Sequence, residues 1–131
     1  QLLAERTGGV RMVSLGGEFL ADRGAFVGPT TEAAVAQLRA RIFFLSPFAV
    51  DARGTYARSP AEASVQRSLM GIADEVVLVA THEAFSRSAP ARVAPLDRLT
   101  GVVAEPWLPP EVVGAMKRAD VTLHAVHGAA C

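Results

Sequence analysis

Three polar residues, Thr81, His82 and Glu83, follow directly after the apolar run at 75–80. An imidazole titrates near neutral pH, so His82 next to a carboxylate could carry out general acid–base chemistry. Adjacent side chains rarely point to one centre, however, and Thr81 has the residue type of a helix N-cap. A zinc site is not indicated, because the chain has neither an H-E-x-x-H motif nor a pair of cysteines. The triplet therefore marks either a ligand contact or an ordinary strand-to-helix turn.

Two carboxylates and two arginines lie in or beside the longest polar loop of the chain. Asp51 and Glu62 could act as an acid–base pair, and Arg53 and Arg58 could hold a phosphate. Each has an ordinary alternative. Ser59 and Glu62 have the spacing of a capping box, and arginines in a polar loop are commonly solvated.

The pair Gly16–Gly17 follows the first apolar run, and its bare backbone amides could approach an anion. The chain has no G-x-G-x-x-G motif and no P-loop, so a dinucleotide site is not indicated. A tight turn is the favoured interpretation of the two glycines.

The elements that must position these residues are short apolar runs alternating with helix-period segments. Strands are expected at 10–15, 42–46, 75–80, 101–104 and 121–126, with a further edge strand at 92–96, and helices at 31–40, 61–73 and 111–119. This alternation predicts an α/β fold with a mostly parallel sheet and helices on both faces. Ligands bind beyond the carboxyl ends of such strands, which selects Gly16–Gly17, Ser46–Pro47, Thr81–His82–Glu83, Glu105 and His127.

Length and composition set the class of protein. The 131 residues, half of them apolar, predict one globular domain. No apolar run approaches the roughly 20 residues of a membrane span, so no contact with a membrane is expected. Thirteen basic residues balance thirteen acidic ones, and the arginines are scattered, so this chain itself is not expected to bind nucleic acid. The lone Cys131 cannot form an internal disulfide, which fits a cytoplasmic location.

An ordered set of segments resembles the C-terminal sensor domain of DeoR-type transcriptional regulators. The segments are "SLGGEFL" (14–20), "AFVGP" (25–29), "RIFFLSPFAVDARG" (41–54), "AEASVQRSLMGIADEVVLVA" (61–80) and "RVAPLDRLTGVVAE" (92–105). The resemblance implies a fold similar to ribose-5-phosphate isomerase and coenzyme A transferases. It also implies a sensor of a phosphorylated sugar or related metabolite that is a homo-oligomer and not an enzyme, with no cofactor and no metal.

The same resemblance implies that residues 1–131 are an N-terminally incomplete sensor domain. A DNA-binding helix-turn-helix and the first strand of the sensor, with its phosphate loop, would lie upstream. The opening "QLLAERTGG" supports this expectation, because it is typical of the last turns of a helix.

The chain departs from the family pattern at the rim of the expected pocket. Where the family has Asp-Ser-Ser-Lys-Phe, this chain has Thr81 in place of Asp and Ala84 in place of Lys. Ser46 and Ala49 replace glycines. The residues expected to contact a ligand are Gly16, Gly17, Asp51, Gly54, Glu62, Thr81 and His82.

Three alternatives remain open for the function of the pocket. In the first, the ligand differs from the usual one and His82 partly replaces the lost lysine. In the second, the sensor has lost its ligand and serves only in oligomerisation. In the third, the domain is an isomerase-like or acyl-transferring enzyme, related to coenzyme A transferases, that uses Asp51 and Glu62 as acid and base.

Overall fold

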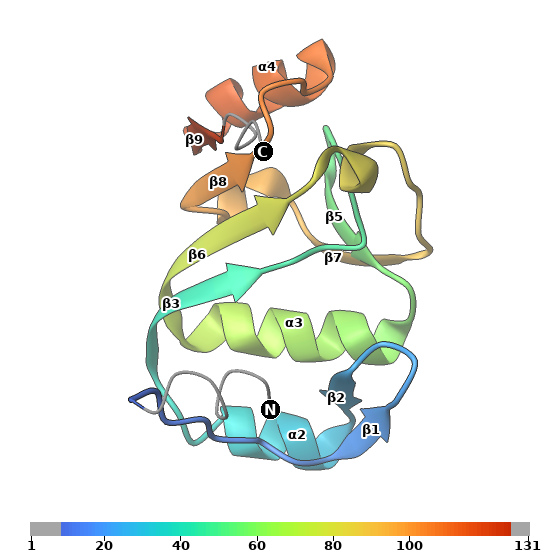
Figure 1. Ribbon diagram of the computed structural model, residues 1–131, viewed down its shortest axis with the longest axis vertical. Coiled ribbons are helices and arrows are strands. Elements are labelled where there is room, and N and C mark those ends of the chain that lie inside the picture. Colours follow the sequence, from blue (N-terminus) through green and yellow to red (C-terminus); the bar gives the residue numbers. More distant parts are fainter. Residues whose placement is uncertain (1–8, 127–131) are drawn as a thin grey trace.

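The computed structural model describes residues 9–126, which form an α/β fold (Figure 1). The strands are β1 Glu18–Leu20, β2 Ala25–Val27, β3 Ala40–Leu45, β4 Ala49–Asp51, β5 Gly54–Ala57, β6 Ala73–Ala80, β7 Ala91–Ala94, β8 Gly101–Ala104 and β9 Thr122–Ala125. The helices are α2 Pro29–Val35, α3 Pro60–Ile72 and α4 Pro110–Arg118, with 3-10 turns η1 His82–Phe85 and η2 Leu96–Arg98.

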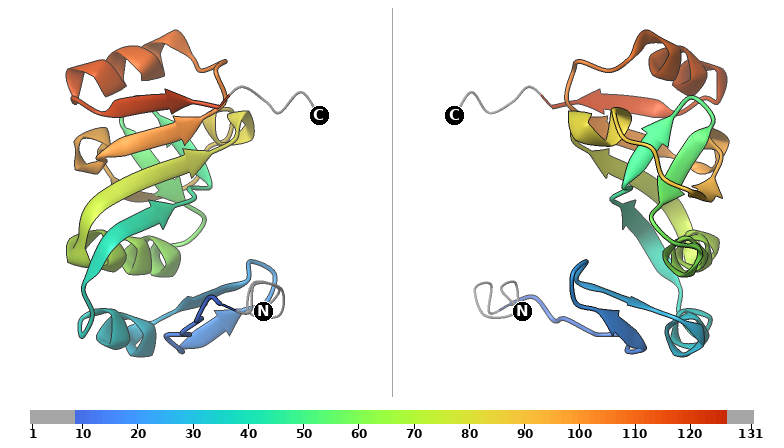
Figure 2. Two further views of the ribbon diagram at one scale, coloured as in Figure 1. Left: turned by 60° about the vertical axis from the view of Figure 1, so that its left-hand side comes forward. Right: turned by 90° about the vertical axis from the view of Figure 1, so that its right-hand side faces the viewer.

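The main sheet has four parallel strands in the order β3-β6-β8-β9. One level of this sheet aligns Leu45, Leu78, Val102 and Leu123 across all four strands. The arrows of the four strands point the same way, and η1 lies at their tips (Figure 2, left). The parallel sheet and the strands expected at 42–46, 75–80, 101–104 and 121–126 are therefore confirmed.

Two smaller sheets were not predicted. Strands β1 and β2 form an antiparallel hairpin, and β4, β5 and β7 form a three-stranded antiparallel sheet. The edge strand expected at 92–96 is β7, which lies at an edge of that sheet and ends before Pro95. The strand expected at 10–15 is wrong: this stretch pairs with no strand of the described residues, and its valines are exposed, Val13 by 73%.

Each of the three described helices begins with a proline in its first turn. Pro60 occupies the first turn of α3, and Ser59 is the N-cap of this helix, as the capping-box spacing predicted. The Ser59 hydroxyl accepts the backbone N–H of Glu62 at 3.3 Å and donates to the Glu62 carboxylate at 2.9 Å. The helix expected at 31–40 is the shorter α2, and the helix at 111–119 is α4.

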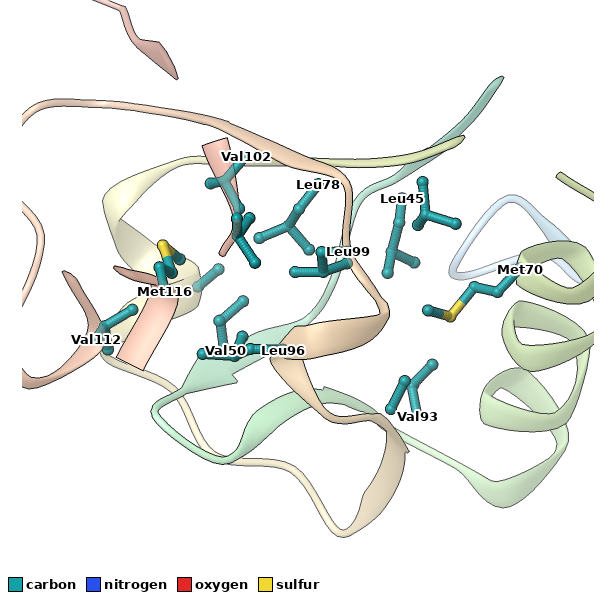
Figure 3. Packing of buried hydrophobic residues seen from close by; sticks show 14 of the residues in the cluster. Leu45, Val50, Met70, Leu78, Val93, Leu96, Leu99, Val102, Val112 and Met116 are labelled. Atoms are coloured by element: carbon teal, nitrogen blue, oxygen red, sulfur yellow. The ribbon is translucent and has the colours of Figure 1, made fainter. Parts of the chain in front are cut away.

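Among the described residues, one apolar cluster joins the main sheet to the sheet of β4, β5 and β7, here called the second sheet, and to the helices α3 and α4 (Figure 3). Leu45, Leu78 and Val102 of the main sheet, each at most 1% exposed, face Val50, Val93 and Leu96, while Met70 of α3 and Met116 of α4 close the ends.

The opposite face of the main sheet carries Phe44, 63% exposed, and Val79, 39% exposed. The predicted α/β class is confirmed, with a parallel sheet and three helices within residues 9–126, and no described helix covers these two side chains. Ala63 and Met70 of α3 and the buried side chains of α4 belong to the same cluster as the sheet of β4, β5 and β7. None of these described helices has the length and hydropathy to cross a membrane.

Replacing Leu78 by Ala should lower the free energy of unfolding by about 2–5 kcal/mol, because the side chain is fully buried. The matched control is Val79→Ala on the exposed face, which should cost less than about 1 kcal/mol. Urea denaturation monitored by circular dichroism measures both values, and equal losses would contradict the assignment of the buried face.

Candidate effector site

Two adjoining hollows lie at the edge of the main sheet, the first beyond the carboxyl ends of β3, β6 and β8 and the second beyond the end of β3 alone. The strand-end hollow, of about 420 Å³, is lined by Ser46, Pro47, Val79, Ala80, Thr81, Ala84, Arg87, Val103, Ala104, Glu105 and Val126. The arginine hollow, of about 320 Å³, is lined by Asp22, Arg23, Ser46, Pro47, Phe48, Ala57, Arg58, Glu62, Gln66 and Arg87. Ser46, Pro47 and Arg87 belong to both, so the two hollows are neighbours.

The turn after β6 is fastened to the end of β8. One carboxylate oxygen of Glu105 accepts the backbone N–H of His82 at 2.6 Å and lies 3.1 Å from Nδ1 of the His82 ring. Thr81 occupies the N-cap position of η1, as expected, but its side chain makes no capping hydrogen bond. Glu105 supplies an oxygen to this turn instead, and Thr81 lines the strand-end hollow.

Hydrogen bonding to His82 lowers the pKa of Glu105. The backbone N–H of His82 is the main cause, and the His82 ring adds to it. A carboxyl group whose pKa is lower in the folded state stabilises the fold above its unfolded pKa and loses that stabilisation as the pH falls through the folded value.

Replacing Glu105 by Gln should therefore destabilise the protein at about pH 6, and the difference from wild type should shrink below about pH 4.5. Urea denaturation over this range measures the difference in unfolding free energy. The control is the variant Glu111→Gln, which should not show this pH-dependent difference. Glu111 is an exposed residue of α4, and its carboxylate forms no hydrogen bond with any described residue. A Glu105→Gln difference that stays constant with pH would contradict the proposed bond.

Glu62 lines the arginine hollow. Its carboxylate lies 3.1 Å from the Arg23 guanidinium, and its side chain is 13% exposed. Arg23 belongs to the turn between β1 and β2, so this ion pair joins the hairpin to the start of α3. The capping role and the position at the hollow are thus both found for Glu62.

Asp51 and Gly54 form the turn between β4 and β5 and line neither hollow. Asp51 accepts hydrogen bonds from the backbone N–H of Arg53 at 2.8 Å and from the Tyr56 hydroxyl at 3.1 Å. Burial, followed by this bond to Asp51, raises the pKa of Tyr56. Gly54 has φ of 147°, and a Cβ there would collide with the Ala94 carbonyl. Asp51 and Glu62 therefore bond to different residues and are not bonded to each other, so they do not form the acid–base pair considered from the sequence.

Gly16 and Gly17 lie beside α2 and line neither hollow. The Thr31 hydroxyl donates to the Gly16 carbonyl at 2.6 Å, and a Cβ on Gly17 would meet the Thr31 side chain. Both glycines have positive φ, 74° and 110°. The pair attaches the segment before β1 to α2, and a contact with a ligand stays a prediction.

Arg23, Phe48 and Arg87 are site residues that sequence reasoning missed. They come from three separate connections, so no spacing along the chain relates them. Arg58, considered as a phosphate contact, does line the arginine hollow, whereas Arg53 does not. His127 lies outside the described residues. Within the described part of the chain, no three His, Cys, Asp or Glu side chains form a group that could hold a metal ion.

Comparison with known proteins identifies the class of the chain. The family model of the DeoR C terminal sensor domain matches residues 1–105. This match covers most of the chain, and the chain belongs to that family.

Two curated relatives are transcriptional repressors by name. The chain is 28% identical over 99 residues to the transcriptional repressor AccR of Agrobacterium fabrum, a match that covers 74% of this chain and 38% of the relative. It is 22% identical over 114 residues to a protein of Escherichia coli O157:H7 named as an aga operon transcriptional repressor, covering 86% of this chain and 42% of that protein. The chain thus spans about two fifths of the length of these relatives.

Proposed function

We propose that the chain is the effector-sensing part of a transcriptional repressor and that the effector binds in the two hollows. One observation carries the proposal: in a chain of the DeoR sensor family, the strand-end hollow lies beyond the carboxyl ends of three parallel strands, and the arginine hollow adjoins it. Ligands of open α/β sheets bind in that place. A phosphorylated sugar or related metabolite is the effector class.

Three of the residues expected from the sequence are proposed to act at this site. Thr81 lines the strand-end hollow, Glu62 lines the arginine hollow, and His82 is fixed to Glu105 at the rim. The other four, Gly16, Gly17, Asp51 and Gly54, are proposed to support the surrounding backbone.

The remaining parts of the proposal concern the whole protein. We propose that a helix-turn-helix outside these residues binds DNA and that the protein acts in the cytoplasm; the repressor names of its relatives support both parts. A regulatory role is preferred to catalysis because the family is one of sensor domains.

Thermal-shift screening against phosphorylated sugars tests the site. A ligand at about 100 times its Kd should stabilise the full natural protein by about 2.7 kcal/mol. Ser46→Trp should abolish the shift, because Ser46 is exposed and lines both hollows, so that an indole there fills the space without disturbing the core.

The control is Ala33→Trp, which places the same bulky group on an exposed position of α2. This variant should keep the full shift. If no phosphorylated metabolite shifts the wild-type protein, or if both tryptophan variants respond alike, the site is not where we place it.

Self-association is also proposed, on the exposed face and edges of the main sheet. Among the described strands, β3 and β9 are unpaired on their outer sides, and unpaired edges are templates for another chain. Phe44 on β3 and Val126 after β9 are 63% and 49% exposed. Burial of this apolar surface favours association.

Light scattering of the 131-residue chain at micromolar concentration should give at least twice the monomer mass of 13.8 kDa. Phe44→Ser should shift the population toward monomer. Leu38→Ser, which removes an apolar side chain 48% exposed outside the main sheet, should not. A monodisperse wild-type monomer would contradict self-association through this surface.

A further inference from the structure

Two guanidinium groups stack on one aromatic ring in the arginine hollow. The Cζ atoms of Arg58 and Arg87 lie 4.4 Å and 4.8 Å from the centroid of Phe48. Phe48 lies between β3 and β4, Arg58 between β5 and α3, and Arg87 after η1. Stacking orients a guanidinium while its N–H groups, which lie in its plane, stay available to an acceptor.

The charges around this ring do not cancel. Arg23 has a carboxylate partner in Glu62 at 3.1 Å. Arg58, in contrast, forms no ion pair or side-chain hydrogen bond with any described residue, and Arg87 has only the exposed Glu83 at 3.7 Å. Three arginines thus line the arginine hollow against two carboxylates, Asp22 and Glu62, and Arg58 is the arginine that no described carboxylate pairs.

Two further polar atoms of the same hollow lack partners. Nε of Arg23 and Oε1 of Gln66 are buried and have no hydrogen-bond partner among the described residues. The Asp22 carboxylate lies 4.0 Å from Arg23 Nε, which is too long for a hydrogen bond. Buried polar atoms normally form hydrogen bonds. The donor Arg23 Nε and the acceptor Gln66 Oε1 are therefore both free to bond to a ligand. A hydroxyl group can serve as either partner, because it both accepts and donates.

We propose that Arg58 and Arg87, oriented by Phe48, bind the oxyanion of the effector, while Gln66 and Arg23 face its hydroxyl groups. The ligand class is a small polyhydroxylated oxyanion, and Arg87 lines both hollows that it would occupy. This inference rests on the proposed function and assigns its charge recognition. Arg58 and Arg87 are the residues that select an anionic effector over its neutral counterpart.

Inorganic phosphate, as the simplest oxyanion, is the probe. The melting temperature of the full natural protein is followed while phosphate replaces chloride at constant ionic strength. A saturable rise is expected in the wild type. Arg58→Ala and Arg87→Ala should each weaken the apparent phosphate affinity on the order of tenfold or more, as the loss of a charge-assisted contact does. The double variant should show no phosphate-specific rise.

The control is Arg98→Ala, which removes the same charge from an exposed position that lines neither hollow and should bind phosphate as the wild type does. If an alanine variant fails to fold, Arg58→Gln and Arg87→Gln keep a planar amide against Phe48 without the charge, and the same loss is expected.

Two results would overturn the inference. The first is that phosphate does not raise the melting temperature of the wild type. The second is that the double variant melts at a lower temperature in chloride but is still stabilised by phosphate, because the arginines would then only hold the loops in place. If either result is found while a phosphorylated sugar still stabilises the protein, the arginine site is refuted and the proposed function stands. Loss of all ligand-dependent shifts would refute the proposed function as well.

Discussion

The site depends on the parallel pairing of β3, β6 and β8 at one buried level. Leu45, Leu78 and Val102 are aligned across these strands and are almost completely removed from water. Strands β6 and β8 end at the same level, at Ala80 and Ala104, and β3 ends two residues earlier, at Leu45. The connections that follow the three strands therefore emerge at one edge of the sheet. A shift of one residue in any strand would turn its buried side chains to the exposed face and would separate these connections.

The connections that emerge there are tied to one another by polar and aromatic contacts. Glu105 holds the turn at His82, and Phe48 contacts arginines from two other connections. The Glu105 carboxylate satisfies the backbone N–H of His82. The stacking on Phe48, in contrast, leaves two cationic guanidinium groups at the surface of the arginine hollow. The apolar sheet thus provides the position of the site, and the loops provide its charge.

Much of the sheet was predictable from the sequence because its strands are continuous apolar runs between marked helix starts. The N-cap of α3 at Ser59 was predictable for the same local reason. The stretch at 10–15 has the same apolar composition, yet it finds no partner strand in the described residues, and composition alone cannot show a missing partner. Strands β1, β2 and β4 escaped prediction because a run of three residues shows no periodicity, and β5 escaped it because its sequence, GTYA, is not an apolar run. The contacts of Arg23 and Arg87 are long-range consequences of the fold, and no local pattern encodes them.

The central claim is that an anionic effector binds where the parallel strands end. The most direct measurement is mapping of backbone amide chemical shifts by NMR during titration with phosphorylated sugars. The account predicts saturable changes clustered at Ser46, Thr81, Arg87 and Glu105, with the turn at Asp51 unaffected. Saturable changes clustered at the Asp51 turn or beside α2, with the strand ends silent, would contradict it.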